Sequence, residues 1–190
     1  MFIGRKEELN FLEDRYNSAD GQLIVLYGRR RVGKTELLRQ FCQDKEHIFY
    51  TCTEIIDEKQ LEAFSQRLLE KNHQAAKYIT HFSDWEQALL SISELAKDKK
   101  IVVVIDEFSY MLKGNNAIPS ILQKLWDEVL KQSNVMLILC GSAISFIEKE
   151  VLAEKNPLYG RATGILKMQA MDFYSAQQFF PNYSIEDTVS

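Results

Sequence analysis

Five short runs of apolar residues recur along the chain, separated by stretches of mixed polarity. The third and fourth runs are almost continuously apolar, which is typical of parallel strands that are buried on both faces. The five predicted strands are residues 22–27, 47–53, 100–105, 135–140 and 163–168.

Amphipathic helices are predicted between these strands. One begins at Asp57, a second begins with a capping box of Ser83 and Glu86, and a third follows Asn116 with Pro119 near its start. Their apolar stripes are, in that order, Leu61, Phe64 and Leu68; Trp85, Ala88, Leu89, Ile92 and Leu95; and Ile121, Leu122, Leu125, Trp126 and Val129. The alternation predicts a doubly wound α/β fold whose ligand lies beyond the carboxyl ends of the strands.

The first candidate site directly follows the first strand. Residues 28–35 read Gly-Arg-Arg-Arg-Val-Gly-Lys-Thr and match the P-loop pattern GxxxxGK[ST] in full. In such a loop the backbone N–H groups and the amino end of the next helix bind phosphates. Lys34 is expected to reach the β and γ phosphates, and the Thr35 hydroxyl to bind Mg²⁺. The alternative is a glycine-containing turn with a solvated lysine.

The second candidate site ends the buried run at residues 101–105. Asp106 fits a Walker B aspartate that holds Mg²⁺, and Glu107 points elsewhere and is expected to polarise the attacking water. The alternative is an ordinary polar strand end. The adjacent Asp-Glu pair favours hydrolysis over simple binding.

Weaker signals come from Ser142 and from several arginines. Ser142 follows the fourth strand and could sense the γ phosphate or orient water, unless Gly141-Ser142 is only a turn. Arg161 precedes the last strand and is either functional or a surface charge. Arg29, Arg30 and Arg31 either raise the potential around the phosphates or are solvated.

Composition narrows the class of protein. The 190-residue chain has a net charge of −4, so the whole domain does not attract nucleic acid electrostatically, and DNA binding is possible but unsupported. No apolar run is long enough to span a membrane, and the charged start does not resemble a signal peptide, so a cytoplasmic location is expected. The three cysteines are expected to be reduced core thiols.

Taken together, these motifs resemble those of archaeal-type ATPases of the STAND class, within the AAA+ superfamily. Residues 2–9 resemble the opening box of that family, whose backbone lies beside adenine, which implies nucleotide contacts at Ile3, Gly4 and Arg5. The resembling P-loop segment, residues 28–38, extends the expected contacts to Val32 and Glu36. Residues 105–108 resemble its Walker B segment, 141–142 its sensor and 158–161 its arginine motif.

The resemblance also implies an architecture. It is a three-layer αβα P-loop NTPase with five parallel strands in the order 5-1-4-3-2, which would put Ser142 beside the γ phosphate. Residues 1–190 are expected to form one ATPase domain, with an adenine-side segment at 1–20 and the start of a helical lid at 170–190. Relatives of this kind often lend an arginine across a subunit boundary, which implies self-association through Arg161.

The expected function is binding of ATP or ADP with Mg²⁺, and hydrolysis by a regulatory or switch ATPase that is weak as an isolated domain. Further domains or protein partners are expected in the full-length protein. The alternatives are a P-loop kinase acting on a small molecule and a nucleotide sensor that does not hydrolyse its ligand. A kinase would need an acceptor pocket and an arginine-rich lid, and the sequence shows no clear acceptor residues.

Overall fold

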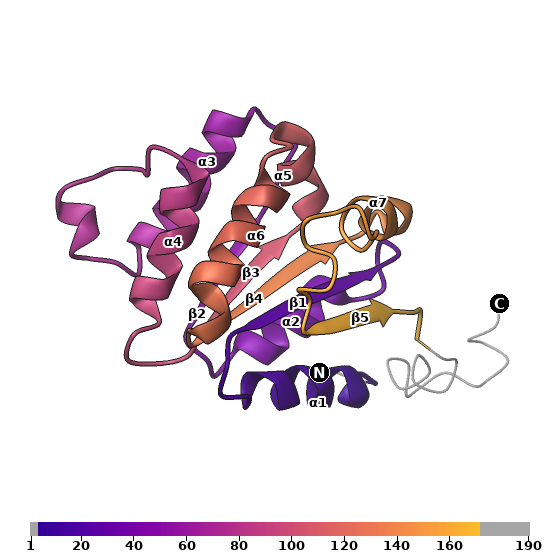
Figure 1. The fold of residues 1–190 in the computed structure, drawn as a ribbon. Coiled ribbons are helices and arrows are strands. Elements are labelled where there is room, and N and C mark those ends of the chain that lie inside the picture. Colours follow the sequence, from indigo (N-terminus) through magenta and orange to yellow (C-terminus); the bar gives the residue numbers. More distant parts are fainter. Residues whose placement is uncertain (1–3, 172–190) are drawn as a thin grey trace, which may run out of the picture.

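A single parallel sheet organises the computed structural model, which describes residues 4–171. Its strands are β1 (Gln22–Gly28), β2 (His47–Thr51), β3 (Ile101–Asp106), β4 (Val135–Gly141) and β5 (Gly164–Met168). They lie in the order β2-β3-β4-β1-β5, with all neighbours parallel, as Figure 1 shows. This confirms the predicted order 5-1-4-3-2, read from the opposite edge. The segment predicted to begin a lid lies almost wholly outside the described residues.

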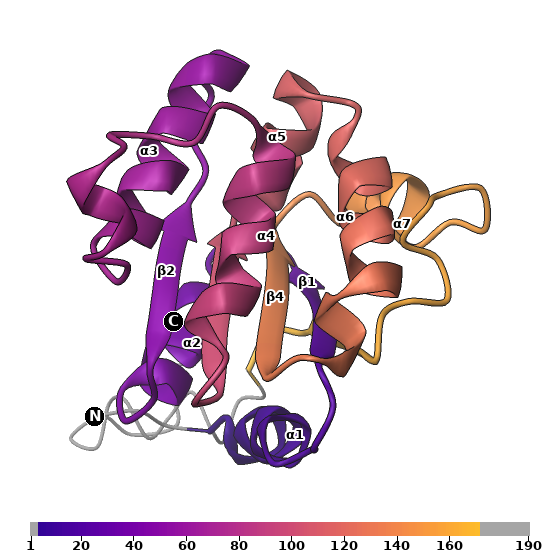
Figure 2. The same cartoon turned by 60° about the vertical axis from the view of Figure 1, so that its left-hand side comes forward.

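Helices cover both faces of the sheet, which confirms the three-layer prediction (Figures 1 and 2). On one face lie α1 (Lys6–Tyr16) and α2 (Lys34–Cys42). On the other lie α3 (Asp57–Leu69), α4 (Trp85–Leu95), α5 (Phe108–Gly114), α6 (Ile118–Glu128) and α7 (Ile144–Glu150), together with the short 3-10 turns η1 (Ala75–Lys77) and η2 (Leu130–Gln132). No helix within residues 4–171 is long and apolar enough to cross a membrane.

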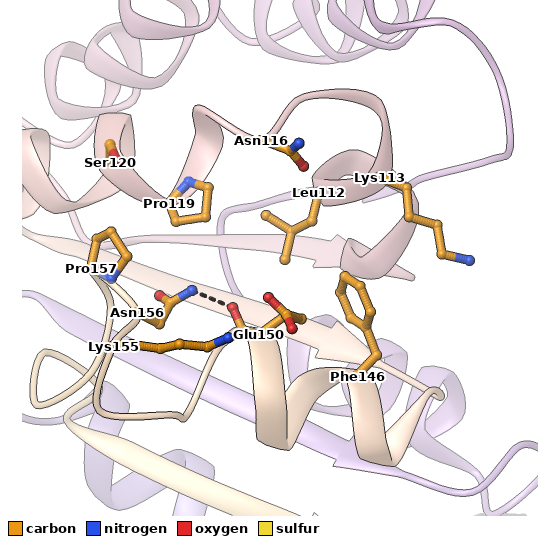
Figure 3. A pocket seen from close by; sticks show the side chains of 10 residues that line it. All are labelled: Leu112, Lys113, Asn116, Pro119, Ser120, Phe146, Glu150, Lys155, Asn156 and Pro157. Atoms are coloured by element: carbon orange, nitrogen blue, oxygen red, sulfur yellow. Dashed lines mark hydrogen bonds between the residues drawn. The ribbon is translucent and has the colours of Figure 1, made fainter.

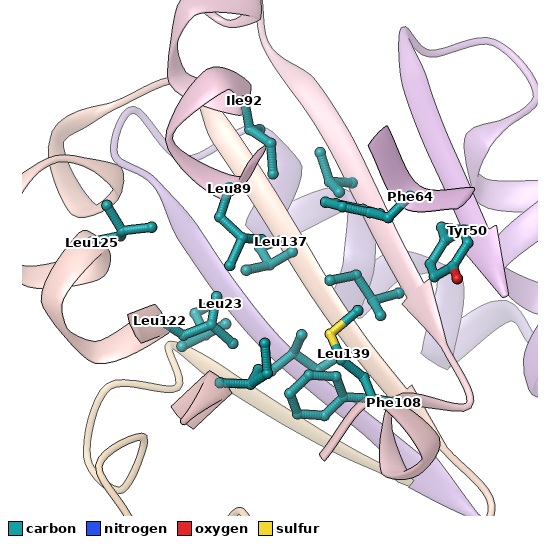
Figure 4. Packing of buried hydrophobic residues seen from close by; sticks show 14 of the residues in the cluster. Leu23, Tyr50, Phe64, Leu89, Ile92, Phe108, Leu122, Leu125, Leu137 and Leu139 are labelled. Carbon is teal, nitrogen blue, oxygen red and sulfur yellow. The ribbon is translucent and has the colours of Figure 1, made fainter. Parts of the chain in front are cut away.

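Two hydrophobic clusters form because side chains alternate across each strand. Leu23 of β1 faces the larger cluster under α3 to α7, whereas its neighbour Ile24 faces the cluster under α1 and α2. Figure 4 shows the larger cluster, in which Leu89 of α4 lies beside Leu137 of the central strand β4 and Leu122 of α6 lies beside Leu23 of β1. Every residue of β1, β3 and β4 is buried, so the three strands that end at the predicted motifs form the rigid centre of the fold.

The predicted capping box is wrong by one residue. Asp84, and not Ser83, is the N-cap of α4, because its carboxylate accepts a hydrogen bond from the Gln87 N–H at 2.8 Å. The Ser83 hydroxyl instead donates to the Asp84 carboxylate. Both residues are acceptable caps by type, so sequence alone did not separate them.

Asp84→Ala is therefore expected to lower the free energy of unfolding by about 1 kcal/mol, because it leaves an N–H group of the first turn of α4 without its acceptor. Urea denaturation followed by circular dichroism measures the change. Ser83→Ala is the matched control and is expected to cost less than half as much. A larger loss in Ser83→Ala than in Asp84→Ala would restore the capping box to Ser83.

Candidate active site

Backbone geometry builds the loop between β1 and α2. A Cβ atom at Gly28 would lie 2.3 Å from the Met168 carbonyl oxygen of the neighbouring strand, so only glycine fits there. Gly33 has φ of 91° and is the N-cap of α2, while Arg31 has φ of 64°. A positive φ is rare for a residue with a side chain and is concentrated at functional sites. The predicted P-loop thus has the strand-to-helix setting that phosphate binding needs.

Lys34 holds the two ends of this loop together. Its side chain is buried, and Nζ donates to the Gly28 carbonyl at 2.9 Å and to the Arg29 carbonyl at 2.8 Å. The side chains of Arg29, Arg30 and Arg31 are exposed and make no hydrogen bond or ion pair with any residue from 4 to 171. Four cationic side chains therefore surround one loop, which favours an anionic ligand. Glu36, also a predicted contact, is exposed in the first turn of α2.

Asp106 ends β3 directly beside the P-loop helix. It is 2% exposed, and its carboxylate accepts hydrogen bonds from the Thr35 hydroxyl at 2.8 Å and from the Glu107 N–H at 2.9 Å. On the next strand, the buried Cys140 thiol lies close to the same carboxylate. Burial, with the nearby Asp106 charge, raises the pKa of Cys140, so this thiol stays protonated and can donate.

The Glu107 carboxylate contacts Ser142, whereas the Asp106 carboxylate contacts Thr35. The Ser142 hydroxyl lies 2.9 Å from Oε1 and 2.8 Å from Oε2 of Glu107, and donates to this carboxylate. Glu107 has φ of 52°, which turns the chain from β3 into α5. β4 lies between β3 and β1, so Ser142, the two carboxylates and the P-loop meet at one end of the sheet.

Arg5 has a role that the sequence reasoning missed. The resemblance implied a backbone contact with adenine, but the buried guanidinium also binds the chain itself. Nη2 donates to the carbonyls of Val32 and Gln169, both at 2.8 Å, and Nη1 pairs with Glu8 at 2.6 Å. Arg5 therefore ties the start of the chain to the P-loop and to the segment that follows β5. Its Nε is buried and has no hydrogen-bond partner in the part of the chain described.

A cavity of about 510 Å³ lies beside this arginine, lined in part by Gly4, Arg5 and Gln169. The predicted adenine-side contacts Gly4 and Arg5 therefore border a cavity between the start of α1 and the segment that follows β5. Ile3, the third such residue, lies outside the described residues.

Arg161 lies at the other end of the sheet. Its guanidinium binds the Asp127 carboxylate through Nε at 3.0 Å and through Nη2 at 2.6 Å, and Nη1 donates to the Pro157 carbonyl. The neighbouring Thr163 N–H donates to the Leu23 carbonyl at the start of β1, whereas the P-loop follows the end of that strand. The structure thus brings Lys34, Thr35, Asp106, Glu107 and Ser142 together but does not bring Arg161 to them within one chain.

A second cavity, of about 650 Å³, lies between α7 and the turn from α5 to α6 (Figure 3). Leu112 and Phe146 point into it from opposite walls, and Pro119 and Pro157 border its other end. α5 starts directly after Glu107, and α7 starts two residues after Ser142. The cavity therefore separates the helices that follow the two members of the Glu107–Ser142 pair.

Cys140 is the site residue that the sequence signal could have found. Ile105 pairs with Leu139 across β3 and β4, so the next residues, Asp106 and Cys140, must also be neighbours. Arg5 and the Arg161–Asp127 pair gave no such signal, because their partners are distant in sequence and lie on irregular segments or on a helix end.

Comparison with known proteins agrees with this geometry. The chain is 36% identical over 189 residues to the uncharacterized protein MJECL04 of Methanocaldococcus jannaschii, and this match covers the whole chain but 40% of that protein. Over 46 residues it is 56% identical to the uncharacterized ATP-binding protein MJ0423 of the same organism, of which it covers 78%.

Solved structures show the same fold. The Walker-type ATPase PABY2304 of Pyrococcus abyssi superposes with a TM-score of 0.73 at 22% identity, over 95% of this chain and 57% of that one. The Aeropyrum pernix ORC1 protein, solved in complex with DNA, superposes with a TM-score of 0.67 at 15% identity, over 95% of this chain and 49% of that one. The chain thus spans about half the length of these proteins.

The family assignment rests on a match over nearly the whole chain. Residues 2–188 match the family described as the ATPase domain predominantly from Archaea. With its P-loop, paired carboxylates and 2-3-4-1-5 sheet, this chain belongs to that family of ATPase domains.

Proposed function

We propose that this domain binds Mg-ATP and hydrolyses it to ADP and phosphate as a regulatory switch of the STAND class. The observation that carries the proposal is the division of labour between two adjacent carboxylates. Asp106 faces Thr35 on the P-loop helix, whereas Glu107 faces Ser142 on the neighbouring strand end. One carboxylate is thus available for a metal ion and the other for a water molecule, as hydrolysis requires.

The residues present fit a magnesium ion. The Thr35 hydroxyl and the Asp106 carboxylate are oxygen ligands of the kind Mg²⁺ prefers, and they already lie 2.8 Å apart. Asp106 is buried and makes no ion pair with any described lysine or arginine. When bound, the ion would neutralise charge on the phosphate oxygens. Thr35 and Asp106 would hold it.

In this proposal the P-loop binds the phosphates. On this proposal Lys34 transfers its hydrogen bonds from the Gly28 and Arg29 carbonyls to phosphate oxygens, because its amine already lies inside the loop. The exposed arginines at 29–31 add positive potential on the outer side. Gly4 and Arg5, with the cavity beside them, form the side on which the base would lie.

Hydrolysis follows from the position of Glu107. Its carboxylate takes a proton from the attacking water, the water oxygen bonds to the γ phosphorus, and the bond from that phosphorus to the bridging oxygen breaks to leave ADP. Ser142 positions the carboxylate through its hydroxyl, at 2.8 and 2.9 Å from the two oxygens. Lys34 stabilises the charge on the transferred group.

Backbone strain supports a switch. The two non-glycine residues with positive φ in the described part of the chain are Arg31 on the P-loop and Glu107. Each such conformation costs on the order of 1–3 kcal/mol, and it persists only where surrounding contacts enforce it. A ligand that changes those contacts can release either residue. We therefore propose that nucleotide state is reported through these two turns to further domains or partners.

Lys34→Ala tests the binding step. With Mg-ATP a hundredfold above its dissociation constant, the free energy of unfolding of the parent domain is expected to rise by about 2.7 kcal/mol, which raises Tm by roughly 5–10 °C. Lys34→Ala is expected to lose most of this gain, because the amine would no longer reach the phosphates. Differential scanning fluorimetry with and without Mg-ATP measures it.

Lys155→Ala is the matched control, because Lys155 is exposed on the loop before β5 and outside the P-loop. It is expected to keep the full shift. If a folded, nucleotide-free parent domain shows no shift, the proposed function fails at its first step.

A further inference from the structure

Among residues 4–171, no strand lies beyond β2, so the described sheet has an open edge there. This strand pairs with β3 on one side only, and Glu46 and Cys52 make backbone hydrogen bonds to β3 at its two ends. Because such bonds alternate along a parallel pair, the N–H and C=O groups of His47, Phe49 and Thr51 point away from β3. No described segment makes a hydrogen bond to these outward backbone groups.

A groove of about 630 Å³ runs along this edge. Its floor is the strand itself, from His47 to Thr51, and its walls are Arg39 of α2 on one side and Gln66 and Arg67 of α3 on the other. Figure 2 shows β2 at the edge of the sheet with α3 beside it. An extended chain would fit between the two helices, with its backbone facing β2.

The β2 edge lacks the usual protection against strand pairing. Proteins commonly place a lysine, a proline or a bulge on an exposed edge. The opposite edge strand, β5, follows this rule, since Lys167 is exposed there and paired with Glu148. β2 reads His-Ile-Phe-Tyr-Thr, with high strand propensity and neither a lysine nor a proline. The edge is thus suited to accept another strand.

The charges that line the groove indicate which kind of strand it would accept. Arg39 is exposed and makes no ion pair with residues 4–171. Arg67 pairs only with Glu70, at 3.1 Å, and both side chains are more than half exposed, so water screens that pair. Glu70 is the one acidic residue that lines the groove. The groove is therefore complementary to carboxylates.

We propose that the β2 edge binds an extended, acidic segment of a partner protein, which adds a sixth strand to the sheet. Backbone hydrogen bonds to His47, Phe49 and Thr51 would supply most of the affinity, and Arg39 and Arg67 would select acidic side chains on the two faces of the added strand. This site lies outside the nucleotide-binding residues, and its existence does not depend on ATP hydrolysis.

A synthetic strand tests the backbone contacts. The probe is a blocked, fluorescent peptide of about six residues, with two adjacent glutamates at its centre and valines on either side, so that one carboxylate lies on each face of the strand. We expect saturable binding by fluorescence anisotropy with a Kd below about 1 mM, and slower hydrogen exchange at the amides of His47, Phe49 and Thr51. A copy of the peptide with alternate backbone nitrogens methylated keeps its charge but loses the N–H groups that would donate to β2. It is expected to bind at least about tenfold more weakly.

A charge exchange tests the choice of partner. The double variant Arg39→Glu, Arg67→Glu is expected to bind the glutamate probe roughly tenfold more weakly, because each exposed arginine–glutamate pair contributes roughly threefold. The same variant is expected to bind a lysine-valine probe more tightly than the parent domain does. Both arginines are on the surface, so Tm and ATP turnover are expected to stay unchanged. Glu70→Gln is the matched control and is expected to leave binding of the glutamate probe equal or tighter.

Several outcomes would overturn the proposal. One is the absence of saturable binding of the glutamate probe up to about 1 mM. Another is equal binding of the methylated copy, which would mean that the backbone edge is not used. A third is protection of the same three amides without any probe, together with a dimer in sedimentation, which would assign the edge to a second copy of this chain.

Discussion

Glu107→Gln is expected to bind Mg-ATP as the parent domain does and to hydrolyse it about a hundredfold more slowly, or slower still. Glutamine has the same shape, and its amide oxygen can still accept the Ser142 hydroxyl, so the turn at φ of 52° is expected to persist. What the substitution removes is the ability to take the proton of the attacking water. Single-turnover hydrolysis and nucleotide titration, measured on the same protein, separate the two effects.

Asp106→Asn is the matched comparison, because it changes the neighbouring carboxylate in the same way. We expect it to weaken the dependence of nucleotide binding on Mg²⁺, since Asp106 and not Glu107 faces Thr35. Parent-like turnover in Glu107→Gln would mean that another residue is the base, and the proposed mechanism would then fail while nucleotide binding could stand.

The sheet could be predicted because its signal is local. Each central strand is a run of apolar residues bounded by polar ones, and burial on both faces leaves no other arrangement for the run at 101–105. The strand at 47–53 was predicted too long, because Gln60 binds both the N–H and the C=O of Thr53 and draws that residue out of the sheet. Strand ends thus depend on side-chain contacts that no periodicity shows.

Three helices gave weaker signals. α1 buries only Leu12 fully, so its apolar pattern is faint, and the sequence indicated no more than an adenine-side segment there. α5 and α7 have seven residues each, too few to repeat an amphipathic pattern. These short helices follow Glu107 and Ser142, so the part of the fold least visible in the sequence is the part that positions the candidate catalytic groups.

The candidate site also contains residues whose neighbours could be predicted from the sequence and residues whose contacts could not. Lys34, Thr35 and Asp106 could be predicted to lie together, because a P-loop and the end of a neighbouring strand impose fixed neighbours. The predicted strand order put Ser142 at the γ phosphate, and its contact with Glu107 appears only in the structure. The contact partner of Arg161 could not be predicted. Asp127 ends a different helix, and only the folded chain brings the two side chains together.

Arg161→Ala is expected to lower ATP turnover on the order of a thousandfold if this arginine acts on the nucleotide of a neighbouring subunit, and to leave nucleotide affinity nearly unchanged. The position of Arg161, at the end of the sheet opposite its own P-loop, is compatible with action between subunits and not within one. Activity per molecule is then expected to rise with protein concentration. Steady-state turnover across a dilution series, with sedimentation to follow association, measures both.

The pair with Asp127 distinguishes this role from that of a surface charge. An exposed pair contributes no more than about 1 kcal/mol, so both Arg161→Ala and Asp127→Asn are expected to be folded. If Arg161 must leave Asp127 to reach a neighbouring phosphate, Asp127→Asn keeps or raises turnover while Arg161→Ala loses it. If the pair only fixes the loop before β5, the two variants behave alike and turnover changes little.

Mixing two inactive variants completes the test. In a mixed assembly, the Arg161→Ala subunit supplies an intact Glu107 and the Glu107→Gln subunit supplies an intact Arg161, so part of the rate is expected to return. Recovery requires that the two groups act on one nucleotide from different chains. If the variants demonstrably associate and no activity returns, Arg161 does not act between subunits, and its bidentate contact with Asp127 is then its role in the protein.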